Sequence, residues 1–261
     1  MWVLGGLSPR RRALVVGVAV LVAVVVAVVA VRVVGGGGDG DAPPQDRPGP
    51  VVLVPGYGGG AGGLRVLADR LRRDGRQAFV LDLPGDGTGD LREQARALDR
   101  RVGEALRGGA PSVDVVGHSA GGVVARLWAA EHDGARKARR IVSLGSPHRG
   151  AQLAAAGTAF GAAACPAACR QLAPGSDLLR DLGGRVPGRP AWMSVWTSLD
   201  ETVTPPESAR LGGAVNVVVQ DVCPNARTGH ADLPSDPYVM GIVLRALGTA
   251  PLTEPSGCAP A

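Results

Sequence analysis

This 261-residue chain has few aromatic residues, and none of its cysteines are spaced as a Cys-x-x-Cys pair. Phe, Trp and Tyr make up 3% of the residues, whereas glycine alone supplies 40. Apolar runs nevertheless recur at strand and helix spacing, which excludes a low-complexity chain. The length suits one sizeable domain or two small ones.

The chain also has little net charge once its N-terminal arginines are set aside. The formal net charge is +5, and Lys137 is the only lysine. Removing the 4 N-terminal arginines from the 28 basic residues leaves the rest of the chain nearly balanced against 23 acidic residues. A near-neutral globular part lacks the electrostatic attraction that nucleic acids require, so we expect no nucleic-acid partner. The four arginines are Arg10, Arg11, Arg12 and Arg32.

The four cysteines all lie in the second half of the chain, and no histidine spacing accompanies them as in a zinc site. We therefore expect no metal site, and two disulfides if the domain is exported to an oxidising compartment. A Cys165–Cys169 bond would close a small loop, and a Cys223–Cys258 bond would tie the C-terminal tail to the loop carrying His230. Four cysteines allow about three pairings, and four reduced core cysteines are a further alternative.

A long uncharged segment follows the first arginines. Residues 13–31 are mostly valine and alanine, and roughly 20 apolar residues can cross a bilayer as a helix. The preceding arginines favour a cytoplasmic N-terminus, which places the rest of the chain outside the cytoplasm. We expect residues 1–34 to form an arginine cluster and a single membrane anchor, followed by a Gly/Pro linker over 35–50 and a globular domain over 51–261. Secretion after signal cleavage is the alternative, although a signal peptide usually has a shorter apolar region of about 7–15 residues.

Continuous apolar runs alternate with amphipathic segments from residue 51 onward. This alternation predicts an α/β domain with a mostly parallel sheet flanked by helices on both faces. Residues 150–190 show no strand pattern, and we expect them to form a cap-like insert. Strands are expected at 51–54, 78–81, 140–144, 192–196 and 215–219 and from 113 onward, and helices at 63–74, 91–106, 237–247 and from about 120 to 132.

The central motif is Gly117-His118-Ser119-Ala120-Gly121, which lies between a predicted strand and a predicted helix. In that setting Gly-x-Ser-x-Gly forms a sharp, strained turn that exposes the serine Oγ. The two glycines avoid clashes where strand and helix nearly touch. The pattern is weak by itself in a glycine-rich chain, but its flanks predict Ser119 as a nucleophile and the Ala120 N–H as an oxyanion donor.

A serine nucleophile requires a positioned base, and His230 is the best placed of the four histidines. It follows the last predicted strand and precedes the last predicted helix, which suits a Ser–acid–His order along the chain. We expect His118, next to the serine, to point away from it. We expect His132 to be a surface residue at the end of a helix, and His148 to be part of the loop structure after the strand that ends at Leu144.

Asp200 is the expected acid of the triad. It follows a predicted strand and precedes His230 in the chain, so its carboxylate would orient the imidazole and stabilise the imidazolium. Glu201 and Asp232 are expected to be solvated or capping residues, and Asp221 is a weaker rival.

The loop after the first strand supports two interpretations. In the first, the Tyr57 N–H is the second oxyanion donor, because the surrounding glycines allow close approach of the backbone. In the second, Gly56, Gly58 and Ala61 open a helix and Asp82 ends the next strand, which is the outline of a dinucleotide site. The second interpretation is disfavoured, because it gives no role to Ser119, Asp200 and His230.

With these residues in place, the chain resembles the bacterial α/β-hydrolase lipases and esterases, above all the small secreted lipases of actinobacteria and bacilli. The resemblance covers about residues 51–247 and implies an α/β-hydrolase fold, preceded here by one transmembrane helix. Two features depart from the family pattern: Pro55 stands where many members have histidine, and many relatives lack the membrane anchor. The matching stretches are Val54-Pro55-Gly56-Tyr57-Gly58, Gly117-His118-Ser119-Ala120-Gly121-Gly122, Leu144-Gly145-Ser146-Pro147-His148-Arg149-Gly150, Asp200-Glu201-Thr202-Val203-Thr204-Pro205, Val215-Asn216-Val217 and Gly229-His230-Ala231-Asp232-Leu233.

The resemblance places the family's nucleophile, acid and base on Ser119, Asp200 and His230. It implies a serine carboxylic-ester hydrolase, a lipase or esterase, that acts outside the cytoplasm on a lipid or ester substrate without a cofactor or metal. An acyltransferase of the cell envelope would use the same residues. A dinucleotide-binding module and an anchored pseudoenzyme on the same fold are alternatives from other functional classes.

Overall fold

The structure is a computed structural model that describes residues 42–159, 161 and 164–261, together with Val18, Val20 and Val22. The chain divides into two units, Met1–Asp41 and Ala42–Ala261. Apart from the three valines, the predicted membrane anchor at residues 13–31 lies outside the described residues. Within the described part, no helix is long and apolar enough to span a bilayer.

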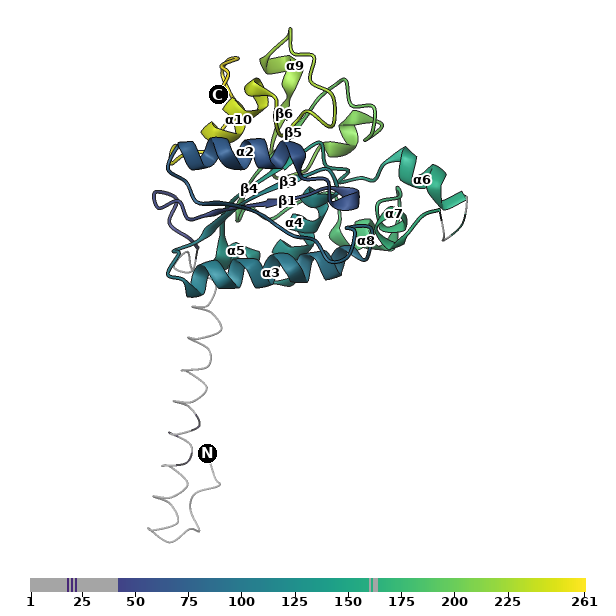
Figure 1. The fold of residues 1–261 in the computed structure, drawn as a ribbon. Coiled ribbons are helices and arrows are strands. Elements are labelled where there is room, and N and C mark those ends of the chain that lie inside the picture. The colour runs from purple at the N-terminus through teal and green to yellow at the C-terminus, as the bar shows by residue number, and fades with distance from the viewer. Residues whose placement is uncertain (1–17, 19, 21, 23–41, 160, 162–163) are drawn as a thin grey trace, which may run out of the picture. The chain divides into compact units, whose positions relative to one another are not determined.

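The described part of the second unit contains one sheet of six parallel strands, in the order β2-β1-β3-β4-β5-β6 (Figure 1). This confirms the predicted α/β architecture. Because all strands run the same way, their carboxyl ends and the loops that follow lie at one edge of the sheet. The strands are β1 (Val51–Val54), β2 (Ala78–Val80), β3 (Val113–His118), β4 (Ala138–Leu144), β5 (Ala191–Trp196) and β6 (Val215–Val218).

Helices cover both faces of the sheet (Figure 1). Alternate residues of β1 enter opposite cores: Val51 and Leu53 pack with α2 (Gly62–Arg73) and α10 (Pro237–Ala246), whereas Val52 and Val54 pack with α3 (Leu91–Arg107) and α4 (Ala120–Glu131). This explains why the strand sequences are continuously apolar. The shorter helical elements are η2 (Tyr57–Gly59), α5 (Gly134–Lys137), α6 (Gln152–Ala159), α7 (Ala167–Gln171), α8 (Asp177–Leu182), η3 (Pro206–Ala209) and α9 (Val219–Val222).

The element boundaries follow the sequence pattern to within one or two residues, and the ends of two strands are informative. Strand β4 begins at Ala138, two residues earlier than expected, because Arg139 and Arg140 are buried within it. The last strand ends at Val218, because Val219 starts the short helix α9. Side-chain caps mark helix starts as propensity predicts: Asp90 Oδ1 accepts from the Arg92 N–H at 2.7 Å, and Asp236 Oδ1 accepts from the Tyr238 N–H at 2.8 Å.

The insert at 150–190 carries α6, α7 and α8 and no named strand in its described residues. It is fastened to the sheet domain by Arg126, a buried residue of α4. The Arg126 guanidinium donates to the carbonyls of Leu182 at 3.1 Å and Gly183 at 2.6 Å, and to that of His148 at 3.3 Å. No carboxylate pairs with it among the described residues, and burial lowers the pKa of Arg126 to about 10.

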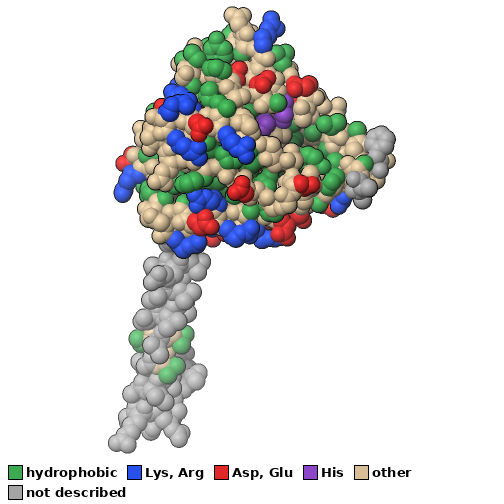
Figure 2. Space-filling view, viewed as in Figure 1, with side chains coloured by type: hydrophobic (Ala, Val, Ile, Leu, Met, Phe, Trp, Pro, Cys, Tyr) green, Lys and Arg blue, Asp and Glu red, His purple; other side chains and the backbone are tan. Residues whose placement is uncertain are grey.

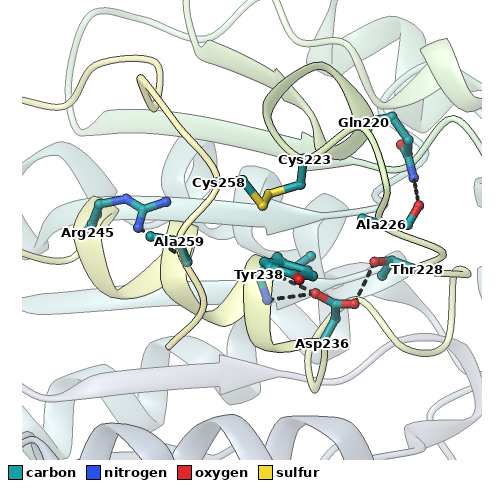
Figure 3. Close-up of a disulfide and its surroundings, with 10 residues drawn as sticks. Gln220, Cys223, Ala226, Thr228, Asp236, Tyr238, Arg245, Cys258 and Ala259 are labelled. Atoms are coloured by element: carbon teal, nitrogen blue, oxygen red, sulfur yellow. Dashed lines mark hydrogen bonds between the residues drawn. A yellow bond between two sulfur atoms is a disulfide. The ribbon is translucent and has the colours of Figure 1, made fainter.

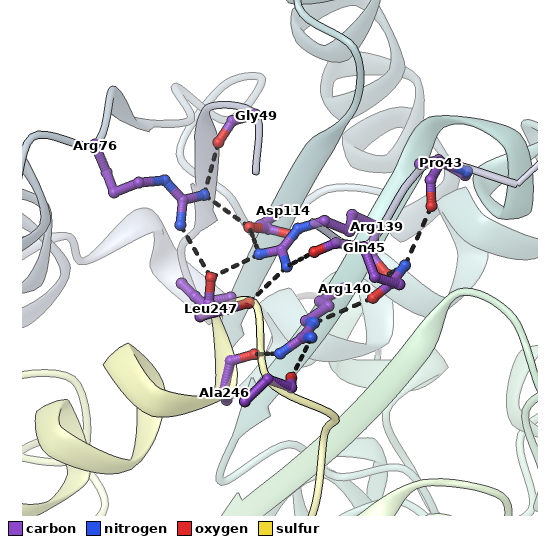
Figure 4. Close-up of polar contacts among 11 residues, drawn as sticks. Pro43, Gln45, Gly49, Arg76, Asp114, Arg139, Arg140, Ala246 and Leu247 are labelled. Carbon is purple, nitrogen blue, oxygen red and sulfur yellow. Dashed lines mark hydrogen bonds and ion pairs between the residues drawn. The ribbon is translucent and has the colours of Figure 1, made fainter. Parts of the chain in front are cut away.

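The amino edge of the sheet contains a buried ion pair that the sequence pattern did not reveal (Figure 4). Asp114 and Arg139 are both inaccessible, and Arg139 Nη2 lies 2.6 Å from Asp114 Oδ2. Arg76 donates to the same carboxylate oxygen at 2.7 Å. Arg139 also donates to the Leu247 and Gly248 carbonyls, each at 2.6 Å, where a cation interacts favourably with the end of α10.

The same cluster holds part of the predicted linker. Arg139 donates to the Gln45 carbonyl at 3.0 Å, and Arg76 donates to the Gly49 carbonyl at 2.6 Å. The described half of that linker, residues 42–50, therefore lies against the globular domain.

Both expected disulfides are formed. Cys165 is bonded to Cys169 within the insert, and Cys223 is bonded to Cys258. The second bond joins the C-terminal tail to the segment between α9 and His230 (Figure 3). The described residues contain no free cysteine.

Replacing Asp114 by alanine should strongly destabilise the domain. Arg139 would stay buried without its counter-ion, so the free energy of unfolding should fall by about 3–5 kcal/mol in urea denaturation. Asp177→Ala is the matched control, because the Asp177–Arg180 pair is largely exposed and should be worth less than about 1 kcal/mol. Equal small losses in the two variants would contradict a structural role for the buried pair.

Candidate active site

Ser119 lies at the turn from β3 into α4 in a strained conformation. Its φ of 54° and ψ of −126° are unusual for a residue with a side chain. Close packing maintains this conformation: a Cβ added to Gly117 would lie 2.5 Å from the carbonyl carbon of Gly121, so a side chain does not fit there. The Ser119 N–H donates to the Leu144 carbonyl at 2.8 Å, which ties the turn to β4.

The structure brings Ser119, His230 and Asp200 into one hydrogen-bonded chain. His230 Nε2 lies 3.0 Å from Ser119 Oγ, and His230 Nδ1 lies 2.7 Å from Asp200 Oδ2. The carboxylate can only accept, so Nδ1 carries the proton and Nε2 is free to accept from the serine hydroxyl. Asp200 and His230 are each 5% exposed, which shields the hydrogen bond between them from water.

Asp200 is itself held by the main chain that follows it. Its Oδ1 accepts from the N–H groups of Thr202 at 3.0 Å and Val203 at 2.7 Å. The other oxygen, Oδ2, therefore points at His230. The rival acids do not reach the imidazole in the described structure, and Glu201 instead lies 3.5 Å from the His230 main-chain nitrogen.

Gly145, at the end of β4, makes room for the acid–base pair. A Cβ at this position would lie 3.1 Å from His230 Nδ1 and 3.2 Å from Asp200 Oδ2. It would lie only 2.6 Å from Leu233 Cδ1, and the φ of +55° disfavours a side chain as well. This role is not evident from the sequence, because the glycine contacts residues that are distant along the chain.

The loop after β1 lies directly against the serine. A Cβ on Gly56 would lie 2.9 Å from Ser119 Cβ and 3.5 Å from Ser119 Oγ. Tyr57 is the next residue and begins η2, and Ala120 begins α4. Among the described main-chain hydrogen bonds outside helices and strands, the N–H groups of Tyr57 and Ala120 have no acceptor.

His118 packs against the base without contacting the serine hydroxyl. Its Nε2 lies 3.0 Å from the His230 carbonyl oxygen, and the two rings are 5.0 Å apart. Since a carbonyl can only accept, His118 Nε2 carries a proton and donates it to this oxygen. Burial, with a smaller effect from the neighbouring His230, lowers the pKa of His118 to about 4.

The other predicted residues lie away from this chain of hydrogen bonds. His148 is buried, and its Nε2 lies 2.9 Å from Ser143 Oγ. Burial holds the pKa of His148 well below its ordinary value. Of the residues behind the dinucleotide interpretation, Gly58, Ala61 and Asp82 line a cavity beside β2. No group of three or more His, Cys, Asp or Glu side chains among the described residues could hold a metal ion.

A family model for the alpha/beta hydrolase fold matches residues 49–203, more than half of the chain. The chain belongs to the α/β-hydrolase family. The match begins just before β1 and ends just after Asp200, so it includes the loop at Tyr57 and the turn at Ser119. A comparison with curated proteins finds no significant match.

Solved structures of low sequence identity share this fold. The mature lipase BlEst2 of Bacillus licheniformis has a TM-score of 0.62 at 20% identity, over 81% of this chain and 96% of that one. The monoacylglycerol lipase of Paleococcus ferrophilus has a TM-score of 0.52 at 17% identity, over 79% and 94% of the two chains. Lipase B of Aspergillus fumigatus has a TM-score of 0.62 at 16% identity; the match covers 81% of this chain but only 54% of the fungal enzyme.

The buried neutral histidines should make the fold acid-sensitive. His118 and His148 stay neutral in the folded protein, whereas in the unfolded chain they bind a proton below their ordinary pKa of 6.5. The unfolded state therefore holds more protons as the pH falls from about 6.5 towards 4, so the free energy of unfolding should fall over this range. Each histidine contributes at most about 1.4 kcal/mol per pH unit.

The variant His118→Gln isolates one of these contributions. Its amide N–H can still donate to the His230 carbonyl but does not titrate. Urea denaturation between pH 7 and 4 should give a shallower loss of stability for the variant than for the wild type. Parallel curves would show that His118 is protonated in the folded state over this range.

Proposed function

We propose that the protein is a serine carboxylic-ester hydrolase that works through an acyl-enzyme. The observation that carries this proposal is the continuous hydrogen-bonded chain from Ser119 through His230 to Asp200, at 3.0 Å and 2.7 Å. A serine hydroxyl is a weak nucleophile unless a base accepts its proton. Here the base is oriented by an acid that is fixed by two main-chain donors.

In the first half of the reaction, Ser119 Oγ attacks the ester carbonyl carbon while His230 Nε2 takes the hydroxyl proton. The carbonyl oxygen becomes an oxyanion, and Asp200 stabilises the imidazolium without accepting its proton. The tetrahedral intermediate collapses when His230 returns the proton to the leaving alkoxide, which departs as the alcohol. The acyl group is then bonded to Ser119.

In the second half, His230 removes a proton from water, whose oxygen attacks the acyl carbon. Collapse releases the carboxylic acid and restores the Ser119 hydroxyl with the proton held by His230. The N–H groups of Tyr57 and Ala120 are the proposed oxyanion donors in both halves. Their position beside Gly56 and Ser119, and their freedom from other acceptors among the described contacts, support this assignment.

Exposed apolar side chains support an apolar substrate. Tyr57 of the oxyanion loop is 44% exposed, and Leu199, next to Asp200, is 46% exposed. Leu153, at the start of α6, is 64% exposed, and the neighbouring Gln152 N–H donates to the Thr204 carbonyl in the loop after the acid. Three exposed apolar groups on segments next to the triad residues or hydrogen-bonded to their loops suit a lipid or another hydrophobic ester.

We place the enzyme at the cell membrane, with residues 13–31 as a single-pass anchor and the catalytic domain outside the cytoplasm. The uncharged length of this segment and the arginines before it support the assignment. The two disulfides agree with an oxidising compartment.

Removing the nucleophile tests the proposed activity. The full-length Ser119→Ala protein in detergent should hydrolyse p-nitrophenyl butyrate about 10⁴-fold or more slowly than the wild type, because the acyl-enzyme cannot form. Ser198→Ala, which removes an exposed hydroxyl outside the hydrogen-bonded chain, should retain full activity. Turnover that survives in a folded Ser119→Ala protein would refute the proposal.

A further inference from the structure

A cavity of about 860 Å³ opens along β2, the edge strand of the described sheet. Helix α2 supplies one wall and α3 the other, while Phe79 and Val80 of β2 and the two residues after the strand, Leu81 and Asp82, form its floor. Its lining includes none of Ser119, Asp200 and His230, so the mechanism above does not use it. Figure 2 shows basic side chains gathered over this face, with acidic side chains between them and histidine close by.

The cavity and the triad share one loop. Gly58 and Gly59 of η2 line the cavity, whereas Gly56, two residues earlier, lies against Ser119. Consecutive Cα atoms are about 3.8 Å apart, so Gly58 is within about 8 Å of Gly56. The Gly58 N–H donates to the Gly87 carbonyl at 3.4 Å, which ties this loop to the cavity's outer turn. The cavity and Ser119 therefore lie beside the same short loop.

Two arginines in the cavity have no counter-ion. Arg65 from α2 and Arg100 from α3 are exposed, and no ion pair with either exists among the described residues. The other two lining arginines are engaged: Arg72 contacts Asp69 at 2.8 Å, and Arg101 contacts Glu104 at 2.9 Å. The two free guanidinium groups face the same space from opposite helices, as expected of a site for a phosphate.

Carboxylates also face this space. Asp82 is exposed at the end of β2 and has no ion-pair partner in the described part of the chain. Asp86 accepts from the Thr88 hydroxyl at 2.6 Å and from its N–H at 2.9 Å, and these hydrogen bonds lower the pKa of its carboxyl. A purely anionic ligand would be repelled by these two groups, whereas an ammonium group would be attracted to them.

We infer that the cavity binds the zwitterionic head group of a glycerophospholipid, with its phosphate at Arg65 and Arg100 and its amine at Asp82 and Asp86. The lipid's acyl ester would then lie across the η2 loop at Ser119. This inference rests on the proposed function and narrows its substrate class. A neutral glyceride would leave all four charged groups without an oppositely charged partner.

Direct binding tests the site independently of catalysis. The full-length Ser119→Ala protein is titrated by calorimetry with dihexanoylphosphatidylcholine, dihexanoylglycerol and inorganic phosphate. The phospholipid should bind at least tenfold more tightly than the diglyceride and than free phosphate. Equal affinities for the two lipids would overturn the inference, and phosphate binding as tight as that of the phospholipid would indicate a simple anion site.

Paired charge variants locate the binding. Arg65→Gln combined with Arg100→Gln should weaken phospholipid binding about tenfold or more and leave diglyceride binding unchanged. Arg73→Gln combined with Arg107→Gln removes the same charge from the ends of the same two helices, outside the cavity lining, and should change neither. Equal losses in the two double variants would show a diffuse charge effect and overturn the site.

Two further measurements separate this inference from the proposed function and from the dinucleotide interpretation. If the wild type hydrolyses p-nitrophenyl butyrate but prefers dihexanoylglycerol to the phospholipid, the head-group site is wrong and the ester hydrolase stands. If the wild type hydrolyses none of these three esters while phospholipid binding depends on Arg65 and Arg100, the proposed function is wrong. A nicotinamide dinucleotide that binds more tightly than the phospholipid, at the site formed by Gly58 and Ala61, would overturn the lipid assignment.

Discussion

Ser119 has a backbone conformation that the surrounding contacts impose on it. Gly117 and Gly121 allow the strand and the helix to touch, and Gly56 brings the loop after β1 against the serine itself. Strained backbone of this kind persists only where the surrounding structure determines it fully. The serine hydroxyl is consequently held within hydrogen-bonding distance of the His230 ring, with Gly56 of the β1 loop beside it. A side chain at any of the three glycines would separate these groups.

The carboxyl and amino edges of the sheet hold two different clusters of residues. At the carboxyl edge, the loops after β1, β3, β4, β5 and β6 bring together Gly56, Ser119, Gly145, Asp200 and His230. At the amino edge, Asp114 and Arg139 form a buried pair that fastens the end of α10 and the segment at Gln45 (Figure 4). The chain that leads into the domain and the helix that follows His230 are therefore held at the opposite edge from the chemistry. The Cys223–Cys258 bond adds a second restraint on the segment before His230 (Figure 3).

Features that depend on residues close together in the chain could be predicted from the sequence. Continuous apolar runs indicated strands buried on both faces, and glycines around a serine indicated a sharp turn. Ser119, Asp200 and His230 could be selected because each follows a predicted strand and because they occur in the order Ser–acid–His along the chain. The structure places these three side chains within hydrogen-bonding distance.

Features that depend on distant partners could not be predicted in this way. His118 donates to a carbonyl 112 residues away, and Arg139 donates to one 108 residues away. Gly145 is constrained by His230 and Asp200, and Arg126 by carbonyls of the insert. Arg65 and Arg100 could not be distinguished from ordinary surface arginines in the sequence. Only the fold places their helices, α2 and α3, on either side of one cavity.

The central claim is that Ser119 is activated by its hydrogen-bonded neighbours, and covalent labelling measures that property most directly. A fluorophosphonate transfers its phosphonyl group to an activated serine with loss of fluoride. Mass spectrometry of the labelled, digested full-length protein should find one adduct, on the peptide that contains Ser119, and none in the folded Ser119→Ala protein. A folded wild-type protein that remains unlabelled, or that is labelled at another residue, would contradict the account.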